Sequence, residues 1–448
     1  MRSAKTRGAL GCLLALCLIL SACAAPGAQR PASAAGAAPS APALTPTRTP
    51  DPTPAATPDP APEPADEPAS ETAPVFIPEA RPLAIRLQAG GPTEPLSDGD
   101  PNTVCAFSKG ETLAISADEP IGGLYLIWYD RPLPCTLHSG GETVPIGAQG
   151  FLHEYVPLSG SERSVVLRLP EEELRIAEIR AFSPGRPPQD VQVWQSPCAE
   201  ADILLVSTHA DDEFIFFGGL LPLYAAERGL AVQVVYTISH YNSLRVRCHE
   251  MLDALWLAGI RRYPVVNDAP DREIYSLGDA EWIYGKDGFA DFLVEQIRRF
   301  RPLVIVTHDE KGEYKQGCHM LTAMSLEKAV VLAADAGFQP ESAERWGLWD
   351  TPKTYLHLFG PEDERTVLDY ETPLGSFGGK TALAVAEEAF ALHVSQQSLH
   401  FRIYERGHAY DSHSFGLFRS LVGPDLQRDD LMENLDPAAW HGRGGDGG

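Results

Sequence analysis

The hydrophobic pattern of this chain changes near residue 190, and this change constrains the fold more than any other feature. Before that point, short strand-like runs are bounded by Gly, Pro, Asp and Ser without a long helical pattern, as at 111–116, 123–128 and 164–169. Such spacing is typical of an antiparallel β-sandwich. We therefore expect a β-sandwich or jelly-roll domain over residues 76–190.

After residue 190, strand-like runs that are apolar throughout alternate with helical runs. Strands are expected at 202–207, 232–238, 265–266 and 303–307, and helices at about 220–228, 243–257 and 289–300, with another beginning around His319. Strands without a polar face need cover on both sides, as in a parallel sheet between helices. The predicted fold class is α/β, a Rossmann-like three-layer sandwich with a parallel sheet over residues 191–435. No Gly-x-Gly-x-x-Gly follows its first strand, which argues against a dinucleotide cofactor.

The charge balance argues against one class of partner. The chain has 36 Lys and Arg against 61 Asp and Glu, a formal net charge of −25. Proteins that bind nucleic acid need clustered basic side chains that neutralise phosphates. We therefore expect no nucleic-acid partner.

The first residues are typical of an export signal. A basic start at Arg2 is followed by the apolar run 9–20, which is too short to span a bilayer as a permanent helix, and then by Leu-Ser-Ala-Cys at 20–23. This tetrad resembles the lipobox of bacterial lipoproteins. The resemblance implies removal of residues 1–22, a lipid on Cys23 and a protein anchored to the extracytoplasmic face of the cell membrane. The alternative is an ordinary cleavage site with a chance cysteine.

Two segments lack the apolar side chains that a core requires. Residues 23–75 are rich in Pro, Ala, Thr and Ser, and residues 436–448 are rich in Gly. We expect both to be disordered, the first as a linker between the membrane and the folded part. Five cysteines follow Cys23, so at least one stays unpaired. Cys105 and Cys135 could form a disulfide, but spacing alone does not establish the pair.

Side chains able to carry chemistry follow two of the expected strands. In open α/β sheets, ligands bind beyond the carboxyl ends of the strands; these positions hold Thr-His-Ala-Asp-Asp-Glu at 208–213 and a second polar run at 307–319. Two imidazoles and one carboxylate that converge provide three protein ligands for zinc and leave one position for water. His209 and Asp212 can face the same point across a turn, and Asp211 then stays free to accept a proton.

Several motifs together resemble the PIG-L (LmbE-like) family of zinc de-N-acetylases. They are His-Ala-Asp-Asp-Glu at 209–213, Arg-Cys-His-Glu at 247–250, Gly-Glu-Tyr at 312–314 with the later His319, and His-Val-Ser-Gln at 393–396. The resemblance covers about residues 200–425 and implies an LmbE-like fold. Carried over by position, it makes His209, Asp212 and His319 the zinc ligands and Asp211 the general base.

Other positions are assigned by the same resemblance or depart from it. Arg247 is expected to contact substrate, although Arg247 and Glu250 could instead be an ordinary pair on a helix surface. Gln316 stands where family members commonly have a second histidine. It can donate an amide hydrogen bond to the reacting carbonyl but cannot act as an acid. His308 or His393 could supply the missing imidazole, or each could be a structural histidine.

The resemblance implies a zinc-dependent de-N-acetylase that hydrolyses the acetamide of an N-acetylglucosamine-type sugar or glycoconjugate outside the cytoplasm. A different class of function stays open, a non-catalytic or weakly active lipoprotein that binds glycans. Residues 96–103 resemble the opening of discoidin-like or galactose-binding-like domains, and Trp128 and Tyr129 could stack on a sugar or belong to the core. Retention of the zinc ligands favours the enzyme, and Gln316 favours the binding protein.

Overall fold

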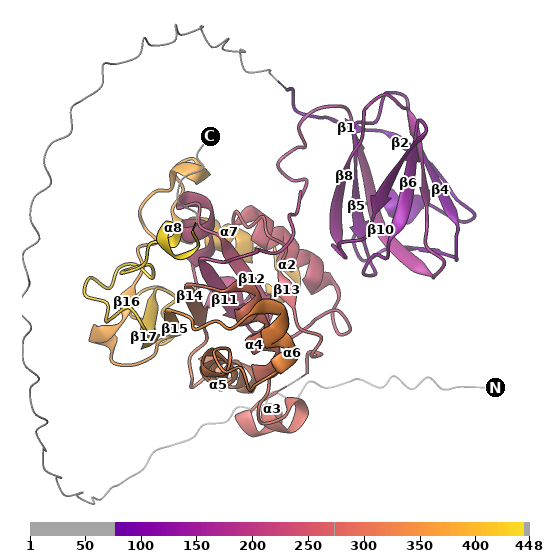
Figure 1. Ribbon diagram of the computed structural model, residues 1–448. Coiled ribbons are helices and arrows are strands. Elements are labelled where there is room, and N and C mark those ends of the chain that lie inside the picture. The colour runs from indigo at the N-terminus through magenta and orange to yellow at the C-terminus, as the bar shows by residue number, and fades with distance from the viewer. Residues whose placement is uncertain (1–76, 273, 443–448) are drawn as a thin grey trace, which may run out of the picture. The chain divides into compact units, whose positions relative to one another are not determined.

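A computed structural model describes residues 77–272 and 274–442 of the chain (Figure 1). The expected signal peptide, the lipid on Cys23 and the whole of the expected linker lie outside the described residues. Within the described ranges, no helix is both long and apolar enough to cross a bilayer.

The region before residue 190 forms two antiparallel sheets, as predicted. One sheet has the order β1-β10-β5-β8, with β3 also paired to β10, and the other has the order β2-β4-β9-β6-β7. The strands are β1 Pro82–Leu83, β2 Ile85–Gln88, β3 Cys105–Phe107, β4 Thr112–Ala117, β5 Gly123–Trp128, β6 Cys135–Ser139, β7 Glu142–Ile146, β8 His153–Pro157, β9 Ser164–Arg168 and β10 Leu174–Phe182; the short η1 is Glu94–Ser97. Alternate residues of β4, namely Leu113, Ile115 and Ala117, are buried in the core between the sheets, which explains the alternating pattern in the sequence.

The structure of this region decides two points that the sequence left open, the role of Trp128 and the pairing of Cys105 with Cys135. The Trp128 side chain is fully buried, and its indole Nε1–H donates to Glu154 Oε2 at 3.0 Å, so it is a core residue and cannot stack on a sugar. The ring of Tyr129 lies against the guanidinium of Arg175, at 4.6 Å from the centroid. Cys105 and Cys135 are both free thiols, so the disulfide considered between them is absent.

The region after residue 190 is built on one mixed sheet with the order β13-β12-β11-β14-β15-β17-β16. Its strands are β11 Ile203–Ser207, β12 Val232–Tyr236, β13 Val265–Val266, β14 Val304–Thr307, β15 Lys353–His357, β16 Thr366–Val367 and β17 Ser414–Ser420. The strands from β13 to β15 are parallel. However, β17 runs antiparallel to both β15 and β16, which corrects the expectation of a purely parallel sheet. Antiparallel neighbours need no crossover helix, and antiparallel edge strands are common on such sheets.

Helices cover both faces of this sheet, which confirms the three-layer prediction. They are α1 Asp212–Ile215, η2 Pro222–Glu227, α2 Val246–Leu257, α3 Leu277–Tyr284, α4 Ala290–Phe300, α5 Gly317–Leu332, α6 Pro340–Trp346, α7 Ala382–Phe390 and α8 Pro437–Trp440, with short turns η3 Glu313–Lys315, η4 Glu362–Glu364, η5 Gly375–Phe377 and η6 Val394–Gln396. Ile203 and Leu205 of β11 pack with residues of α1, α2 and α7, whereas Leu204 and Val206 pack with residues of α4 and α5. Successive residues of the strand therefore serve opposite layers, which explains why β11 is apolar throughout.

The end of α2 and the start of α8 test two predictions made from the sequence. Gly259, the predicted cap after α2, has φ 91° and its amide bonds the carbonyl of Trp256, a conformation that favours glycine. The tail predicted to be disordered from residue 436 instead begins with α8, capped by the Asp436 side chain, which accepts from the Ala438 amide. That prediction is therefore wrong for residues 437–440.

Candidate metal centre

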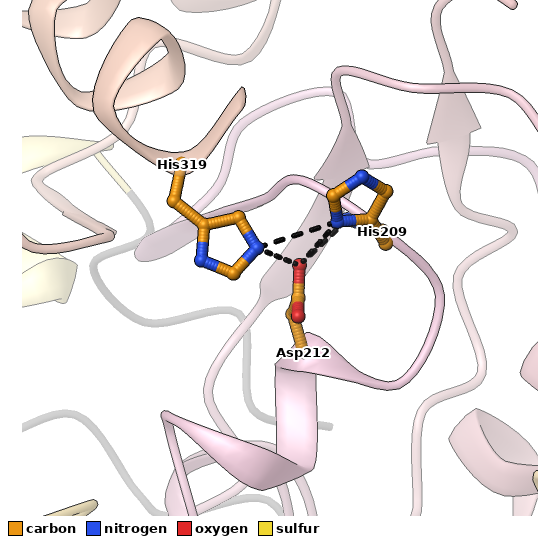
Figure 2. Close-up of side chains that lie close together, drawn as sticks. All are labelled: His209, Asp212 and His319. Atoms are coloured by element: carbon orange, nitrogen blue, oxygen red, sulfur yellow. Dashed lines mark hydrogen bonds and ion pairs between the residues drawn. The ribbon is translucent and has the colours of Figure 1, made fainter. Parts of the chain in front are cut away.

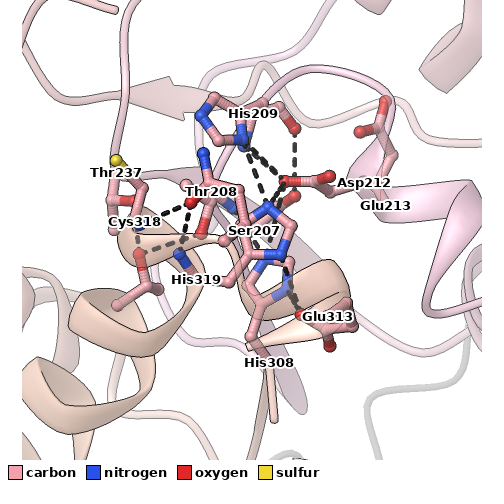
Figure 3. A network of polar contacts seen from close by, with 12 residues as sticks. Ser207, Thr208, His209, Asp212, Glu213, Thr237, His308, Glu313, Cys318 and His319 are labelled. Atoms are coloured by element: carbon pink, nitrogen blue, oxygen red, sulfur yellow. Dashed lines mark hydrogen bonds and ion pairs between the residues drawn. The ribbon is translucent and has the colours of Figure 1, made fainter. Parts of the chain in front are cut away.

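The candidate site begins at the carboxyl end of β11, where a turn of four residues, 208–211, leads into α1. Each of the four backbone amides of this turn donates to a side chain. Thr208 N donates to His308 Nε2 at 3.0 Å, His209 N to Asp212 Oδ2 at 2.7 Å, Ala210 N to His240 Nε2 at 3.2 Å and Asp211 N to Glu213 Oε2 at 2.7 Å. Figure 3 shows part of this network around His308 and Asp212. The turn is therefore fixed from several elements at once, which orients the side chains that it carries.

The structure brings the three expected ligands together (Figure 2). His209 Nδ1 lies 3.2 Å from Asp212 Oδ2, and His319 Nε2 lies 3.3 Å from each of these two atoms. All three residues are candidates for a metal group. A tetrahedral zinc with bonds of about 2.0–2.1 Å has ligand atoms about 3.3–3.4 Å apart. The donor set and its spacing therefore fit zinc.

The tautomer of His319 suits this arrangement. Its Nδ1 lies 2.8 Å from Glu313 Oε2, and a carboxylate only accepts, so Nδ1 carries a proton and the lone pair of the neutral ring is on Nε2, which faces Asp212. Burial disfavours the imidazolium, but the carboxylates of Asp212 and Glu313 raise the pKa of His319 to about 10. Metal binding at this site must displace a proton from His319.

A second group, made by His308, Glu313 and His319, also satisfies the distance criterion for a metal. Its hydrogen bonds argue against that role. His308 Nε2 accepts the Thr208 amide, so its proton is on Nδ1, which lies 2.9 Å from Glu313 Oε2. An imidazole nitrogen that carries a proton offers no lone pair to a metal.

Asp211 lies beside the ligands but is not one of them. Its side chain is 5% exposed and its Oδ1 accepts from Arg247 Nη2 at 3.0 Å. Burial raises the pKa of Asp211 to about 7, although Arg247 opposes this shift. Burial also tends to raise the pKa of the neighbouring Asp212, but His319 and His209 hold that pKa well below its ordinary value. Two adjacent carboxyl groups thus have pKa values moved in opposite directions, as separate base and ligand roles require.

Arg247 and Glu250 are both buried, so the interpretation of an ordinary surface pair is wrong. Arg247 Nη2 also donates to the carbonyl of Ala210. Glu250 instead accepts from the amide and hydroxyl of Ser395, at 2.8 and 2.6 Å. Arg247 lines the cavity beside Asp211, whereas Glu250 ties α2 to η6.

Gln316 is the N-cap residue of α5. Its Oε1 accepts from the amides of Cys318 and His319. The side chain also lines the cavity. Because the carbonyl oxygen is used by the cap, the amide Nε2–H groups are what Gln316 can offer to a bound molecule.

Neither histidine considered as a replacement for the missing imidazole lies at the cavity wall. His308 is fully buried between Thr208 and Glu313. His393 is also fully buried, with Nε2 3.2 Å from Glu213 Oε1. Burial opposes protonation of His393, but Glu213 raises its pKa. Both are structural histidines in this arrangement.

A cavity of about 290 Å³ opens over the three ligand residues and Asp211. Its wall includes the guanidinium of Arg247, Gln316, and the side chains of Asp271, Tyr275 and Phe401. A volume of this order lies near the lower end of the range for small-molecule sites. It therefore suits a small molecule.

The sequence analysis missed residues that hydrogen-bond to the turn at 208–211 and to the ligand residues, directly or through one another. His240 Nδ1 lies 3.1 Å from Asp271 Oδ2 while its Nε2 accepts the Ala210 amide, and Glu313 contacts three imidazoles. His240 lies just after the carboxyl end of β12, so its position along the chain was a usable signal. Glu313 lies in the Gly-Glu-Tyr motif at 312–314, which gave it no role by itself, and Asp271 carries no comparable signal.

The comparisons with known proteins concern mainly this region. Residues 204–330 match the PIG-L family model, described as GlcNAc-PI de-N-acetylase. The matched range contains His209, Asp211, Asp212 and His319, the residues that converge below the cavity.

Proteins similar to this chain include two deacetylases of 1D-myo-inositol 2-acetamido-2-deoxy-alpha-D-glucopyranoside. The one from Catenulispora acidiphila is 30% identical over 185 residues, which is 36% of this chain and 56% of the relative. The one from Salinispora arenicola is 29% identical over 288 residues, which is 53% of this chain and 92% of the relative. This chain thus spans little more than half the length of the first of these relatives.

Solved structures were also found for both regions. N,N'-diacetylchitobiose deacetylase from Pyrococcus horikoshii has a TM-score of 0.34 and 17% identity, and covers 45% of this chain and 73% of that chain. CpGH89CBM32-6 from Clostridium perfringens has a TM-score of 0.19 and 15% identity, and covers 22% of this chain and 93% of that chain.

Proposed function

We propose that this protein is a zinc-dependent de-N-acetylase that hydrolyses the acetamide of an N-acetylglucosamine-type sugar or glycoconjugate. The observation that carries this proposal is the convergence of His209 Nδ1, Asp212 Oδ2 and His319 Nε2 beside Asp211 at the base of an open cavity. The names of its relatives support the substrate class, because they describe deacetylases of an acetamido sugar.

His209, Asp212 and His319 would hold the zinc. When bound, zinc polarises a carbonyl and lowers the pKa of water. Asp211 supplies the proton transfers. With a pKa of about 7, its carboxylate can take a proton from the attacking water as the water oxygen bonds to the acetamide carbon. The same group then gives this proton to the nitrogen as the C–N bond breaks, which yields the free amine and acetic acid, and the acid then ionises to acetate.

Arg247 and Gln316 both line the cavity and can assist this chemistry. Arg247 holds Asp211 by an ion pair and lines the cavity, so it can orient both the base and the substrate. The Gln316 amide can donate a hydrogen bond to the carbonyl oxygen as negative charge develops on it. Since Gln316 has no acidic proton to give, the proton on the leaving amine must come from Asp211 in this scheme.

The test is an assay of the purified protein for bound zinc and for free amine released from N-acetylglucosamine and its oligomers. The Asp211→Asn variant keeps the size of the side chain but removes the base, so we expect its kcat to fall by about 10²–10⁴ with zinc content unchanged. Equal amine release by wild type and variant would count against the mechanism.

A second function is favoured by one observation, the presence of Gln316 in place of a histidine. A weakly active or non-catalytic lipoprotein that binds glycans would retain affinity for acetylated sugars. Isothermal titration with N-acetylglucosamine oligomers separates the two functions: binding without amine release supports this alternative.

We also propose that the protein acts outside the cytoplasm, anchored through a lipid on Cys23. The support is the order of basic start, apolar run and Leu-Ser-Ala-Cys at 20–23. In a bacterial host that processes lipoproteins, Cys23→Ser should move the protein from the membrane fraction to the soluble fraction. Ser21→Ala, which leaves the cysteine in place, is the control.

A further inference from the structure

Glu313 lies behind the candidate metal centre and contacts three imidazoles. Its side chain is fully buried. Oε2 lies 2.9 Å from His308 Nδ1 and 2.8 Å from His319 Nδ1, and Oε1 lies 2.6 Å from His357 Nδ1. Figure 3 shows Glu313 with His308 and His319 next to Asp212. A fourth donor, the Asp309 amide, lies 3.1 Å from Oε1.

The direction of each hydrogen bond follows from the partners on the far side of each ring. His308 Nε2 accepts the Thr208 amide at 3.0 Å, so Nδ1–H donates to Glu313. His357 Nε2 lies 2.8 Å from the carbonyl of Asp411, which can only accept, so this nitrogen carries a proton. These constraints make Glu313 an acceptor for His308 and His319, so that the lone pair of a neutral His319 ring is on Nε2.

Through these bonds, Glu313 reaches both loops that supply ligands. It holds His319 on α5 directly. It holds the other loop through His308, whose Nε2 fixes the amide of Thr208, the residue before His209. The two loops are 110 residues apart in sequence at His209 and His319, and this single carboxylate connects them.

We propose that Glu313 is a positioning residue that sets the tautomer of His319 and aligns both ligand loops for zinc. This inference rests on the proposed zinc site. A merely structural role predicts a different behaviour: removing the carboxylate would lower stability but leave the zinc affinity of the folded protein unchanged. The zinc affinity and the protonation of the His319 ring therefore separate the two roles.

The test uses the full chain with Glu313→Gln, which keeps the size of the side chain but replaces one acceptor oxygen by a donor. We expect zinc affinity, measured by competition with a chelator on protein shown to be folded by circular dichroism, to fall about 10–100-fold. Nitrogen-detected NMR of the zinc-loaded protein, in which the His319 ring is neutral, should also show that His319 loses its Nδ1–H form. Glu310→Gln, the same change at an exposed position of the same loop, should bind zinc like wild type.

A second variant keeps the proposal testable if Glu313→Gln does not fold. His308→Phe preserves the ring that stacks on His319, at 4.3 Å between centroids, but breaks the link to Thr208. We expect weaker zinc binding with the His319 tautomer unchanged. Wild-type zinc affinity in a folded Glu313→Gln or His308→Phe protein would overturn the inference. Failure of both variants to fold would also overturn it, because the cluster would then serve stability. If wild type itself binds no zinc, the proposed function fails instead.

Discussion

Asp211 combines a strained backbone with a buried carboxyl group. Its φ is 111°, in a region that residues other than glycine rarely adopt. Such strain persists only where neighbours fix the conformation, and here Glu213 accepts the Asp211 amide while Arg247 binds the carboxylate. The Asp211 carboxylate bonds to Arg247 whereas the Asp212 carboxylate lies beside His209 and His319, so one can hold a metal while the other stays available for proton transfer.

Arg247 should set the pH at which Asp211 works. Asp211 acts as a carboxylate, so kcat/KM should fall as the pH drops through its pKa of about 7. Arg247 lowers that pKa, and Arg247→Met should therefore move the acidic limb of the kcat/KM profile upward, by about 1–3 pH units. Arg247→Lys retains the charge and should shift the limb less. An acidic limb at the same pH in wild type and Arg247→Met would contradict the assignment.

At the scale of elements, Gln316 has two functions that can be separated. As the N-cap of α5 it accepts the amides of Cys318 and His319, and in the cavity it offers its own amide hydrogens. Gln316→Ala should cost about 1 kcal/mol in urea unfolding and, through loss of the amide donor, about 10² in kcat. Gln316→Ser restores a cap but not the donor, so stability should recover while kcat does not. Wild-type kcat in Gln316→Ser would exclude the donor role.

The turn after α1 depends on close packing at Gly218. This residue has φ 52°, and a Cβ there would lie 2.7 Å from Tyr370 Cε2 and 2.9 Å from Ser412 Oγ. Gly229 has a similar φ of 66° but no atom within 4 Å of the corresponding position. Gly218→Ala should therefore be more destabilising than Gly229→Ala by about 1–3 kcal/mol, as measured by chemical unfolding. Equal losses would mean that the contacts around Gly218 can relax.

At the scale of the whole molecule, zinc binding and stability should be linked. A ligand that binds only the folded state at 100 times its Kd stabilises by about 2.7 kcal/mol. We expect urea unfolding at neutral pH to show this gain on adding zinc to chelator-treated protein. Magnesium, which prefers oxygen ligands, should have no such effect. His319→Ala should abolish the zinc response; a variant that is still stabilised by zinc would show that the ion binds elsewhere.

The layers of the molecule were predictable because they depend on which faces of each strand and helix are buried, and neighbouring residues in the sequence show this. Alternation in β4 and the continuous apolar run in β11 reflect how many faces of each strand are buried, and that information is present in a few neighbouring residues. The antiparallel edge made by β16 and β17 was not predicted. Strand direction at an edge depends on the path of the chain, which no short pattern encodes.

The sequence by itself determined the three layers and the strand ends where polar residues gather, because the burial pattern of each element follows from local spacing. Only the tertiary structure decided which of those residues meet. It brought His319 to His209, buried His308 and His393 in structural pairs, and placed His308, His319 and His357 around Glu313. Hydrogen bonds between distant segments decide the protonation and orientation of each ring, and they form only when the sheet brings those segments together.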